Sequence, residues 1–533
     1  MTSEVTEELK SKTEASMRTT NHNVISLVRW VEFQRPALFS RKSVRLLITL
    51  LMMFGMFCST SLRNNLGVTI VCMVNATAFK SNVPEKIPLL NAAREPENCP
   101  VSVASKSPEE SGYDGDLLWD SHTQGIVFSA VGFGSLVTLL PAGMIADKFG
   151  PKHLIFWALL SMAINTYISP LMANFHPWAF AASRFALGVS NGFIMPSMTA
   201  VGARWFVPDE RSTMNALYTS GIQLSGIFLG LTTPFLCEWK FLGGWPLVYY
   251  VLATMTVGWG VLWCCLATNH AEKNTRISEA EKYYITENVV VKKNQKRTPF
   301  PVCEAMTSMP FWAVMIVRVT LVTQQKIMMS YTASFIRDVL RADLTMNGVY
   351  TALPYMAQLV SKNVVSAFAD YLKRRKIMSH TTSVRLFQSI ASCGIAVCFL
   401  GLAFFADCNH VALGVVLLTF KNIFTSFVSP GMHTSALSIA PLHSGALHSV
   451  TMFVAFLVSS ASPILVGMVL QNNSKAEWSL IFVFIASLNI ISGIFFAIFG
   501  SAEAQEWSMP TGKTFPAPPV PVSDGDTQVQ KEA

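Results

Sequence analysis

Long apolar runs recur along this chain, and they constrain its fold more than any other feature. They extend from about Arg45 to about Ser501 of the 533 residues. Because roughly 20 helical residues cross a hydrocarbon core, each run is long enough to span a bilayer. The sequence therefore predicts an all-α membrane protein with twelve transmembrane helices. We place the spans near residues 46–75, 122–143, 152–172, 177–200, 214–236, 244–267, 311–335, 345–369, 384–406, 410–434, 445–471 and 478–501.

Composition and charge support a membrane location. Hydrophobic residues make up 51% of the chain and charged residues 14%, whereas soluble domains carry about 25% charged residues. The formal charge of +8 comes mostly from basic clusters in the polar segments 268–310 and 372–383. The positive-inside rule places these segments in the cytoplasm, so we expect no nucleic-acid partner. The polar amino terminus lacks the apolar core of a signal peptide and should also stay in the cytoplasm.

The long central linker divides the spans into six and six. We expect a cytoplasmic tail (1–43), an amino-terminal six-helix bundle (44–267) with an outer loop (76–121), a cytoplasmic linker (268–310), a carboxy-terminal six-helix bundle (311–501) and a disordered cytoplasmic tail (502–533). Two sequons, Asn75-Ala76-Thr77 and Asn472-Asn473-Ser474, fall on the outer face under this topology. Asn75 and Asn472 are therefore candidate glycosylation sites.

A short motif is repeated at equivalent positions of the two halves. Gly143-Met-Ile-Ala-Asp147-Lys148-Phe-Gly150-Pro-Lys152 follows the second span, and Ser366-Ala-Phe-Ala-Asp370-Tyr-Leu-Lys373-Arg374-Arg375 follows the eighth. An aspartate at the cytoplasmic end of a helix can pair with basic residues in a tight turn and latch one conformation. A parallel repeat of two bundles is the architecture in which a central cavity alternates its access. The predicted latch residues are Gly143, Asp147, Lys148, Gly150, Lys152, Asp370 and Arg374.

Further segments from the first span to just past the last carry a family resemblance. They are Arg63-Asn64-Asn65-Leu66, Trp119 to Gly125, Arg184-Phe185-Ala186-Leu187-Gly188, Trp205 to Ser212, Gly244-Trp245-Pro246, Ile277-Ser278-Glu279 with Tyr284-Ile285, Ala352-Leu353-Pro354-Tyr355, Ile439-Ala440-Pro441 and Phe499 to Glu503. With the loop from Gly143 to Lys152, the chain resembles the major facilitator superfamily. It is similar to the sodium–phosphate and vesicular organic-anion transporters, the group of sialin and the vesicular glutamate transporters. The resemblance implies a carrier for phosphate, carboxylates or acidic amino acids, driven by sodium, protons or membrane potential.

Three positions depart from the pattern of this family. Sialin-like and glutamate-transporting members have a carboxylate in the fourth span where this chain has Asn191. Glutamate transporters have an arginine where Leu321 stands, and Ser438 replaces the aspartate that ends the tenth-span pattern. Because an amide does not titrate near neutral pH, we expect transport to depend more on sodium or membrane potential than on protons.

Six cations fall inside the predicted spans, almost without carboxylates. An ionisable residue in hydrocarbon is costly and usually faces a cavity, so these cations predict an electropositive cavity for a small anion. The guanidinium of Arg63 suits bidentate contact with a carboxylate or phosphate. Arg318 and Lys362 lie nearer the cytoplasmic side and are interpreted as structural. We expect the substrate-binding residues to be Arg63, Arg184, Asn191, Lys326 and Lys421.

Histidines and cysteines add weaker signals. Three histidines near the junction of the tenth and eleventh spans titrate near neutrality when unperturbed, but are interpreted as solvated or hydrogen-bonded. They are His433, His443 and His448. Most of the ten cysteines, including Cys72, are interpreted as small buried hydrophobes. Cys99, Cys237 and Cys408 lie near the outer loops, and the sequence leaves open whether two of them form a disulfide.

These features predict a secondary transporter of small anions that works by alternating access. Two alternatives remain, an uncoupled anion uniporter or channel, suggested by Asn191, and a transport-inactive sensor. The chain has no Gly-Lys-Ser/Thr phosphate loop and no His-Glu-x-x-His, so we expect no enzyme activity, no cofactor and no metal site. Sodium or a proton is the expected coupling ion. We expect a monomer in the lipid bilayer, of the plasma membrane rather than of a vesicle or lysosome.

Overall fold

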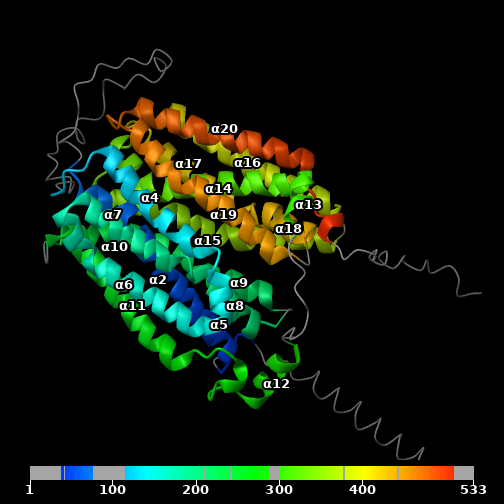
Figure 1. The fold of residues 1–533 in the computed structure, drawn as a ribbon. Helices are drawn as coiled ribbons and strands as arrows, with labels where there is room; N and C mark the ends of the chain where they lie inside the picture. Colours follow the sequence, from blue (N-terminus) through cyan, green and yellow to red (C-terminus); the bar gives the residue numbers. More distant parts are fainter. Residues whose placement is uncertain are drawn as a thin grey trace, which may run out of the picture.

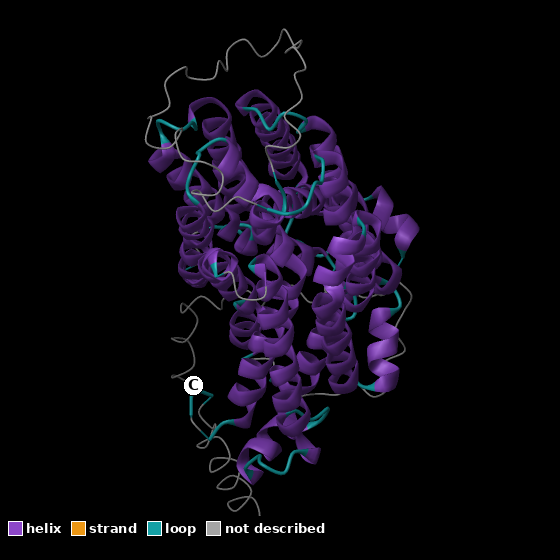
Figure 2. Cartoon of the chain, turned by 90° about the vertical axis from the view of Figure 1, so that its left-hand side faces the viewer, coloured by secondary structure: helices purple, strands orange, loops and turns teal. Residues whose placement is uncertain are grey.

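The computed structural model describes residues 38–40, 42–75, 115–207, 210–239, 243–288, 301–375, 378–440 and 443–508. Within these ranges the regular secondary structure is helical, apart from one isolated bridge between Val74 and Leu117, and short loops connect the helices (Figures 1 and 2). The all-α prediction is therefore confirmed. We call the side that carries α12 (Glu279–Asn288) and α13 (Val302–Thr307) the linker side, and the opposite side, with Asn75 and Asn472, the loop side.

The amino-terminal half forms a bundle of six helical rods. They are α2 (Val44–Met73), α4 (Ser121–Leu139), α6 (Pro151–Phe175), α7 with α8 (Pro177–Asn191 and Ile194–Trp205), α9 with α10 (Arg211–Thr219 and Gly221–Glu238) and α11 (Trp245–Leu266). α2 packs against α10 and α11, and α7 packs against α4 and α6. The fourth rod is interrupted at Gly192, where a Cβ atom would lie 2.2 Å from the Thr138 hydroxyl of α4. This close approach of α4 requires glycine.

The carboxy-terminal half forms the second bundle. Its rods are α14 (Met309–Asp338), α15 (Leu344–Arg374), α16 (His380–Phe405), α17 with α18 (Val411–Ser426 and Thr434–Ile439), α19 (Ser444–Val469) and α20 (Lys475–Phe499). The π-helical turn η4 (Ser429–His433) joins α17 to α18 and contains Pro430, whose missing N–H interrupts the regular hydrogen-bond ladder. α16 packs against α17 and α20, and α14 packs against α19 and α20.

Equivalent helices of the two bundles make equivalent contacts with the opposite bundle. α4 packs against α19, α10 packs against α15, and α2 packs against α14. Counted along the twelve rods, α4 and α19 are the second and eleventh, and α10 and α15 are the fifth and eighth. A shift of six rods exchanges these two contacts, as expected for two six-helix repeats related by a pseudo-two-fold axis.

Hydropathy alone identifies only part of this arrangement. Eight helices among the described residues are long and apolar enough to cross a membrane by length and composition. The other four rods are α4, the broken α7 with α8, α14 and α15. α4, α14 and α15 contact the other bundle, and α14 and α15 carry Arg318, Lys326 and Lys362. These polar side chains lower the mean hydropathy of α14 and α15. The two helices tolerate them because they lie along the seam between the bundles, where protein replaces lipid.

The predicted latch segment forms a short helix, α5 (Ala142–Phe149), and a tight turn. Gly150 ends α5 with φ +83°, a conformation that favours glycine, and Pro151 begins α6. Lys152 donates from its backbone nitrogen to Asn269 Oδ1 and from Nζ to the Cys264 carbonyl, each over 2.9 Å. The turn is therefore held against the linker-side end of α11.

The pairing of the latch stays a prediction. Lys148 is exposed and lies over the Phe149 ring. The side chains of Asp147, Asp370 and Arg374, and the packing of Gly143, lie outside the described part of the structure.

The two sequons share one side of the protein. Asn75 and Asn472 line the same recess on the loop side, together with Trp119 and Arg337. This agrees with a topology in which both asparagines lie on the face opposite the linker. Their glycosylation stays a prediction.

Disulfides join cysteines near the loop side. Cys72 of α2 and Cys237 of α10 form a disulfide, so the interpretation of Cys72 as a buried hydrophobe is wrong. The apolar run that contains Cys72 ends beside α10, and only the packing of these helices brings the two thiols together. Cys408 is also disulfide-bonded, and Cys99 lies outside the described residues.

The loop-side half of the seam is closed by direct helix contact. A Cβ atom on Gly67 of α2 would lie 2.1 Å from the Met329 carbonyl oxygen of α14, and one on Gly125 of α4 would lie 2.5 Å from the Pro463 carbonyl oxygen of α19. Each glycine meets the backbone of the opposite bundle. Small residues allow such close approach between membrane helices, so these positions favour the loop-closed conformation.

We predict that Gly67→Ala opens the loop side. The added methyl cannot fit against the α14 carbonyl unless the helices separate, so the conformational balance should shift away from loop-side closure. A cysteine introduced as Thr332→Cys, in the wall between the bundles, should then react several-fold faster with a membrane-impermeant thiol reagent added on the loop side.

Gly258→Ala is the matched control. Nothing lies within 4 Å of a Cβ atom at Gly258, so labelling at Thr332→Cys should not change in that variant. Equal labelling rates in both alanine variants would contradict the role of Gly67.

Candidate functional site

Arg184 of α7 fixes the backbone of α2 at the centre of the amino-terminal bundle. Its side chain is 1% exposed. Nη1 donates to the Leu62 carbonyl over 3.2 Å and to Asn65 Oδ1 over 3.1 Å, and Nη2 donates to the Arg63 carbonyl over 2.6 Å. These bonds hold the turn of α2 that contains Arg63. In this conformation Arg184 is a positioning residue, and its predicted contact with substrate stays a prediction.

Arg63 keeps most of its own hydrogen-bonding capacity. Its Nε donates to Asn64 Oδ1 over 3.3 Å, and its two terminal nitrogens have no partner among the described residues. The side chain is half-buried and lies near Tyr355 of α15, in the opposite bundle. A guanidinium with free terminal nitrogens in a protein-lined space is arranged for bidentate contact with a carboxylate or phosphate.

Lys326 of α14 supplies a second cation from the opposite bundle. It is half-buried, and within the described ranges its ammonium has neither a hydrogen bond nor an ion pair. Arg63 and Arg184 both lie close enough to repel it. Like charges in a low-dielectric interior raise the free energy of the protein unless an anion joins them. The structure therefore brings three predicted residues, Arg63, Arg184 and Lys326, into one electropositive cluster.

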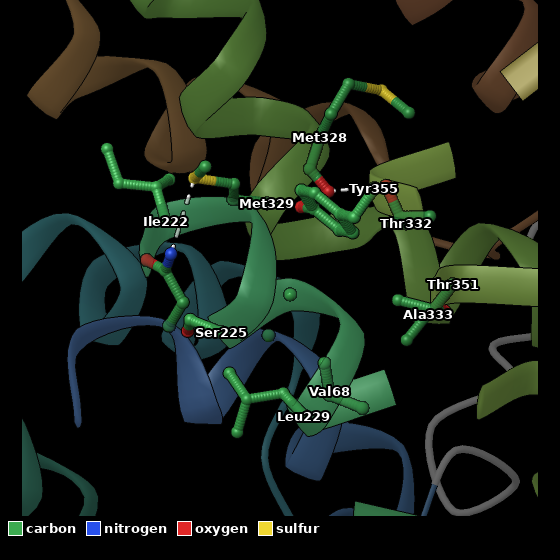
Figure 3. Close-up of a pocket in the computed structure, with 13 residues that line it drawn as sticks. Val68, Ile222, Ser225, Leu229, Met328, Met329, Thr332, Ala333, Thr351 and Tyr355 are labelled. Atoms are coloured by element: carbon green, nitrogen blue, oxygen red, sulfur yellow. Dashed lines mark hydrogen bonds between the residues drawn. The ribbon is translucent and has the colours of Figure 1, made fainter. Parts of the chain in front are cut away.

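A small cavity lies at the seam between the bundles, and Asn64, the neighbour of Arg63 in the chain, is in its wall (Figure 3). Asn64 Nδ2 donates to Met329 Sδ over 3.5 Å across the seam, and Tyr355 lies both in the cavity wall and near Arg63. An occupant would thus touch both bundles, as alternating access requires. The lining residues are Asn64, Gly67, Val68, Ile222, Ser225, Gly226, Leu229, Met328, Met329, Thr332, Ala333, Thr351 and Tyr355.

Asn191, at the end of α7, forms a bridge between helices. Its Nδ2 donates to Ser135 Oγ of α4 over 3.1 Å, and its Oδ1 accepts from Ser59 Oγ of α2 over 3.4 Å. The Ser135 hydroxyl itself donates to backbone carbonyls at Val131 and Gly188. The serine oxygen therefore needs a donor, which an amide provides and an ionised carboxylate does not. The described contacts give Asn191 a packing role, and its predicted contact with substrate stays a prediction.

Lys421 lies apart from the cluster. It is 7% exposed, donates to Asn422 Oδ1 over 2.8 Å and lies near Cys398 of α16. Its helix, α17, packs against α15 and α16 within the carboxy-terminal bundle. The structure does not bring Lys421 together with the three clustered cations, and substrate binding by Lys421 stays a prediction.

Sequence reasoning missed a buried ion cluster on the linker side. Arg45, at the start of α2, is 0% exposed and pairs with Glu210 and with Glu281 of α12 (Nε to Oε1, 2.9 Å). Glu281 also accepts from Ser43 Oγ and from the backbone nitrogens of Val44 and Arg45, each over 3.0 Å. The first N–H groups of a helix lack intrahelical partners and favour a carboxylate. This cluster fastens the linker helix to the amino-terminal bundle.

A signal for this cluster was present in the sequence. Glu210 lies in the family-like segment that ends at Ser212, and Glu281 follows the segment Ile277-Ser278-Glu279. Both carboxylates belong to polar stretches that adjoin spans. Their common partner could not be identified, because Arg45 stands 165 and 236 residues away from them.

Residues 52–463 match the sequence profile of the Major Facilitator Superfamily. The chain is 31% identical over 489 residues to the uncharacterized transporter slc-17.3 of Caenorhabditis elegans, a match that covers 88% of this chain and 90% of that protein. It is 29% identical to a putative inorganic phosphate cotransporter of Drosophila melanogaster (88% and 87% covered) and 27% identical to sialin of Homo sapiens (88% and 91% covered).

Solved structures share the fold. A bacterial homologue of the human lysosomal transporter Spinster, in an inward-facing and occupied conformation, matches with a TM-score of 0.60 at 11% identity, covering 85% of this chain and 96% of that one. A D-xylose–proton symporter matches with a TM-score of 0.59 at 12% identity, covering 86% and 99%. At these identities the likeness concerns the fold alone.

We predict that Glu281→Gln loosens α12. Removing one member of a buried ion pair is strongly destabilising, typically by about 3–5 kcal/mol, because the remaining charge loses its partner. The linker helix should detach more often, so trypsin should cleave at Lys282 faster in the variant. Glu279→Gln is the control, since Glu279 is 89% exposed and pairs only at the surface. Cleavage rates that match in the two variants would refute the anchoring role of Glu281.

We predict that Arg63→Gln weakens anion binding by at least about tenfold, since a charge-assisted hydrogen bond contributes roughly 1.5–3 kcal/mol and 1.4 kcal/mol is a factor of ten. Arg63→Lys keeps the charge but loses the planar fork, so it should restore only part of the affinity. The measurement is the concentration dependence of uptake, normalised to the amount of protein in the membrane.

Arg276→Gln serves as the control for Arg63, because Arg276 is exposed outside the spans and should leave uptake unaltered. Normal abundance with unchanged uptake kinetics in Arg63→Gln would reject Arg63 as an anion ligand and leave Lys326 as the principal candidate.

Proposed function

Because this chain belongs to the Major Facilitator Superfamily, we propose that it carries small anions across a membrane by alternating access between its two bundles. The chain is an integral multi-pass membrane protein of a transporter family and not an enzyme, which confirms those two predictions. The predicted resemblance to the phosphate and sialin-like transporters is confirmed as well.

The unpaired cations of the central cluster carry the proposal for an anion. Arg63 and Lys326 come from opposite bundles and lie within electrostatic range of each other, and neither forms a salt bridge with a described carboxylate. The free energy of the empty site is raised by their repulsion, and a bound anion lowers it. Because the cations come from both bundles, the electrostatic environment of a bound anion changes when the bundles move relative to each other.

Phosphate is the first substrate to test. The Drosophila relative is named as a putative inorganic phosphate cotransporter, and the forked geometry of Arg63 suits phosphate and carboxylate equally. We therefore propose phosphate or a small organic carboxylate as the substrate class. We propose the plasma membrane as its location and a monomer as its working form.

Sodium or the membrane potential is the proposed driving force. By the family resemblance, Asn191 occupies the position at which sialin-like and glutamate-transporting carriers have a carboxylate. Both polar atoms of its amide are hydrogen-bonded. An amide at this position neither takes up nor releases a proton at neutral pH. The same observation favours one further candidate, an uncoupled anion uniporter.

Uptake into proteoliposomes tests the transport proposal. We expect radiolabelled phosphate, or one member of a panel of carboxylates, to accumulate in protein-containing vesicles above the level of empty vesicles. Absence of uptake of every anion under sodium, proton and voltage gradients applied separately would rule out transport of this substrate class.

A separate experiment tests the driving force. We predict that collapsing the proton gradient lowers uptake by less than half, whereas removing sodium or the membrane potential lowers it strongly. Uptake that persists without any gradient, down the substrate gradient alone, would identify the uncoupled uniporter. If collapsing the proton gradient abolished uptake, the interpretation of Asn191 would be wrong.

A further inference from the structure

Arg318 of α14 is a buried cation that the central cluster does not use. Its side chain is 1% exposed, and two of its nitrogens, Nε and Nη1, are buried without a hydrogen-bond partner in the described part of the chain. No ion pair among the described residues involves it. Burial of an unpaired guanidinium raises the free energy of the folded protein. A charge held at this cost calls for a counter-charge, and no residue in the described ranges provides one.

Two histidines lie near Arg318, and Lys362 lies near one of them, His433. His433 of η4 lies within electrostatic range of Arg318, Lys362 and His448, and His448 of α19 lies within range of Arg318. η4 packs against α14 and α15, and α19 packs along α14. Four elements therefore converge on one cluster of basic groups. No described carboxylate is among the charges that act on the two histidines.

The two histidines give this cluster access to solvent. Both His433 and His448 are exposed, although the protein around them removes much of their hydration. Lys362 lies at the seam between the bundles, because its Nζ donates to Thr219 Oγ1 of α9 over 2.9 Å. An anion that enters along the seam can therefore reach Lys362, which lies near His433.

The cluster lies between the central site and the linker side. Arg318 and Lys326 stand eight residues apart on α14, which is about 12 Å along the helix and about 80° around it. They therefore project from neighbouring faces of one helix. α14 begins at Met309, close to the linker, so Arg318 is the nearer of the two to the linker side.

We propose that Arg318, His433, His448 and Lys362 form a second binding site for a small oxyanion such as inorganic phosphate. The free nitrogens of Arg318 supply the charge-assisted hydrogen bonds, and the imidazoles and the ammonium surround the anion with further donors. A role for this site as a station on the transport route rests on the proposed function. The binding of an anion there does not.

The test isolates this site by removing the central one. The full-length protein carrying both Arg63→Gln and Lys326→Gln is placed in lipid nanodiscs, and equilibrium binding of radiolabelled inorganic phosphate is measured. We expect saturable binding of one phosphate per chain in this background. Adding Arg318→Met should weaken that binding by at least about tenfold, the loss of one charge-assisted contact.

Arg385→Met is the matched control. Arg385 is also a cation on the linker side, but it donates to the Gly500 carbonyl over 2.6 Å and does not belong to the cluster. Phosphate affinity should be unchanged when Arg385→Met is added to the same background. Absence of saturable binding in the background overturns the second site. Binding that Arg318→Met leaves unaltered also overturns it and indicates an adventitious ion only.

Thermal unfolding separates ligand binding from a structural role. Because Arg318 is unpaired, Arg318→Met should unfold at an equal or higher temperature than its parent without phosphate. Saturating phosphate should raise the unfolding temperature of the background protein and not that of Arg318→Met. A lower unfolding temperature in Arg318→Met, with the phosphate effect retained, would assign Arg318 to the fold and overturn the proposal.

A second variant covers the case in which Arg318→Met fails to fold. The double variant His433→Gln and His448→Gln removes the exposed part of the cluster and should weaken phosphate binding several-fold at an unchanged unfolding temperature. Unchanged affinity would overturn the proposal. Uptake by the unmodified protein is measured in parallel, so that loss of transport with intact binding would reject the proposed function and leave the second site in place.

Discussion

The candidate site depends on the hydrogen bonds from Arg184 to α2. Three donors of one buried guanidinium are used by the Leu62 carbonyl, the Arg63 carbonyl and Asn65 Oδ1. In a medium without water these bonds replace the hydration that the guanidinium has lost. Through its two terminal nitrogens Arg184 fixes the position of Arg63, whose own terminal nitrogens have no partner among the described residues.

α2 is bonded to the amino-terminal bundle at both ends and in the middle. At the linker side Arg45 pairs with Glu210 and Glu281, in the middle Arg184 holds the backbone, and at the loop side Cys72 is bonded to Cys237. Its contacts with the other bundle are of a different kind, a close approach to the α14 backbone and a weak bond to a thioether. When the bundles move, α2 therefore carries Arg63 with it, and the distance between Arg63 and Lys326 changes. An anion held by both cations, as proposed, would therefore bind differently in the two conformations.

The described interior contains cations in excess, and their arrangement follows the seam. The central cluster and the Arg318 cluster both lie on helices that contact the opposite bundle or on elements packed against them. Cations facing lipid would raise the free energy without any compensation, whereas cations facing the seam can be neutralised by a passing anion. The same argument explains why α14 and α15 are too polar to be recognised as membrane helices by hydropathy.

Local sequence pattern determined the helices of this protein. The span expected at residues 46–75 is the helix Val44–Met73, and the one expected at 478–501 is Lys475–Phe499, because apolar length and polar ends are properties of consecutive residues. The breaks at Gly192 and η4 were not predicted, since they follow from contacts with neighbouring helices.

The sequence by itself also identified Arg63 and Lys326 as cations without nearby carboxylates. Only the tertiary structure decided that Arg184 positions Arg63, that Asn191 bridges two serines, that Lys421 lies apart and that Arg45 meets Glu281. Each of these outcomes depends on how a helix is rotated about its axis and which helix packs beside it. Those are set by the shapes of many side chains distant in sequence, and no pattern within a single span encodes them.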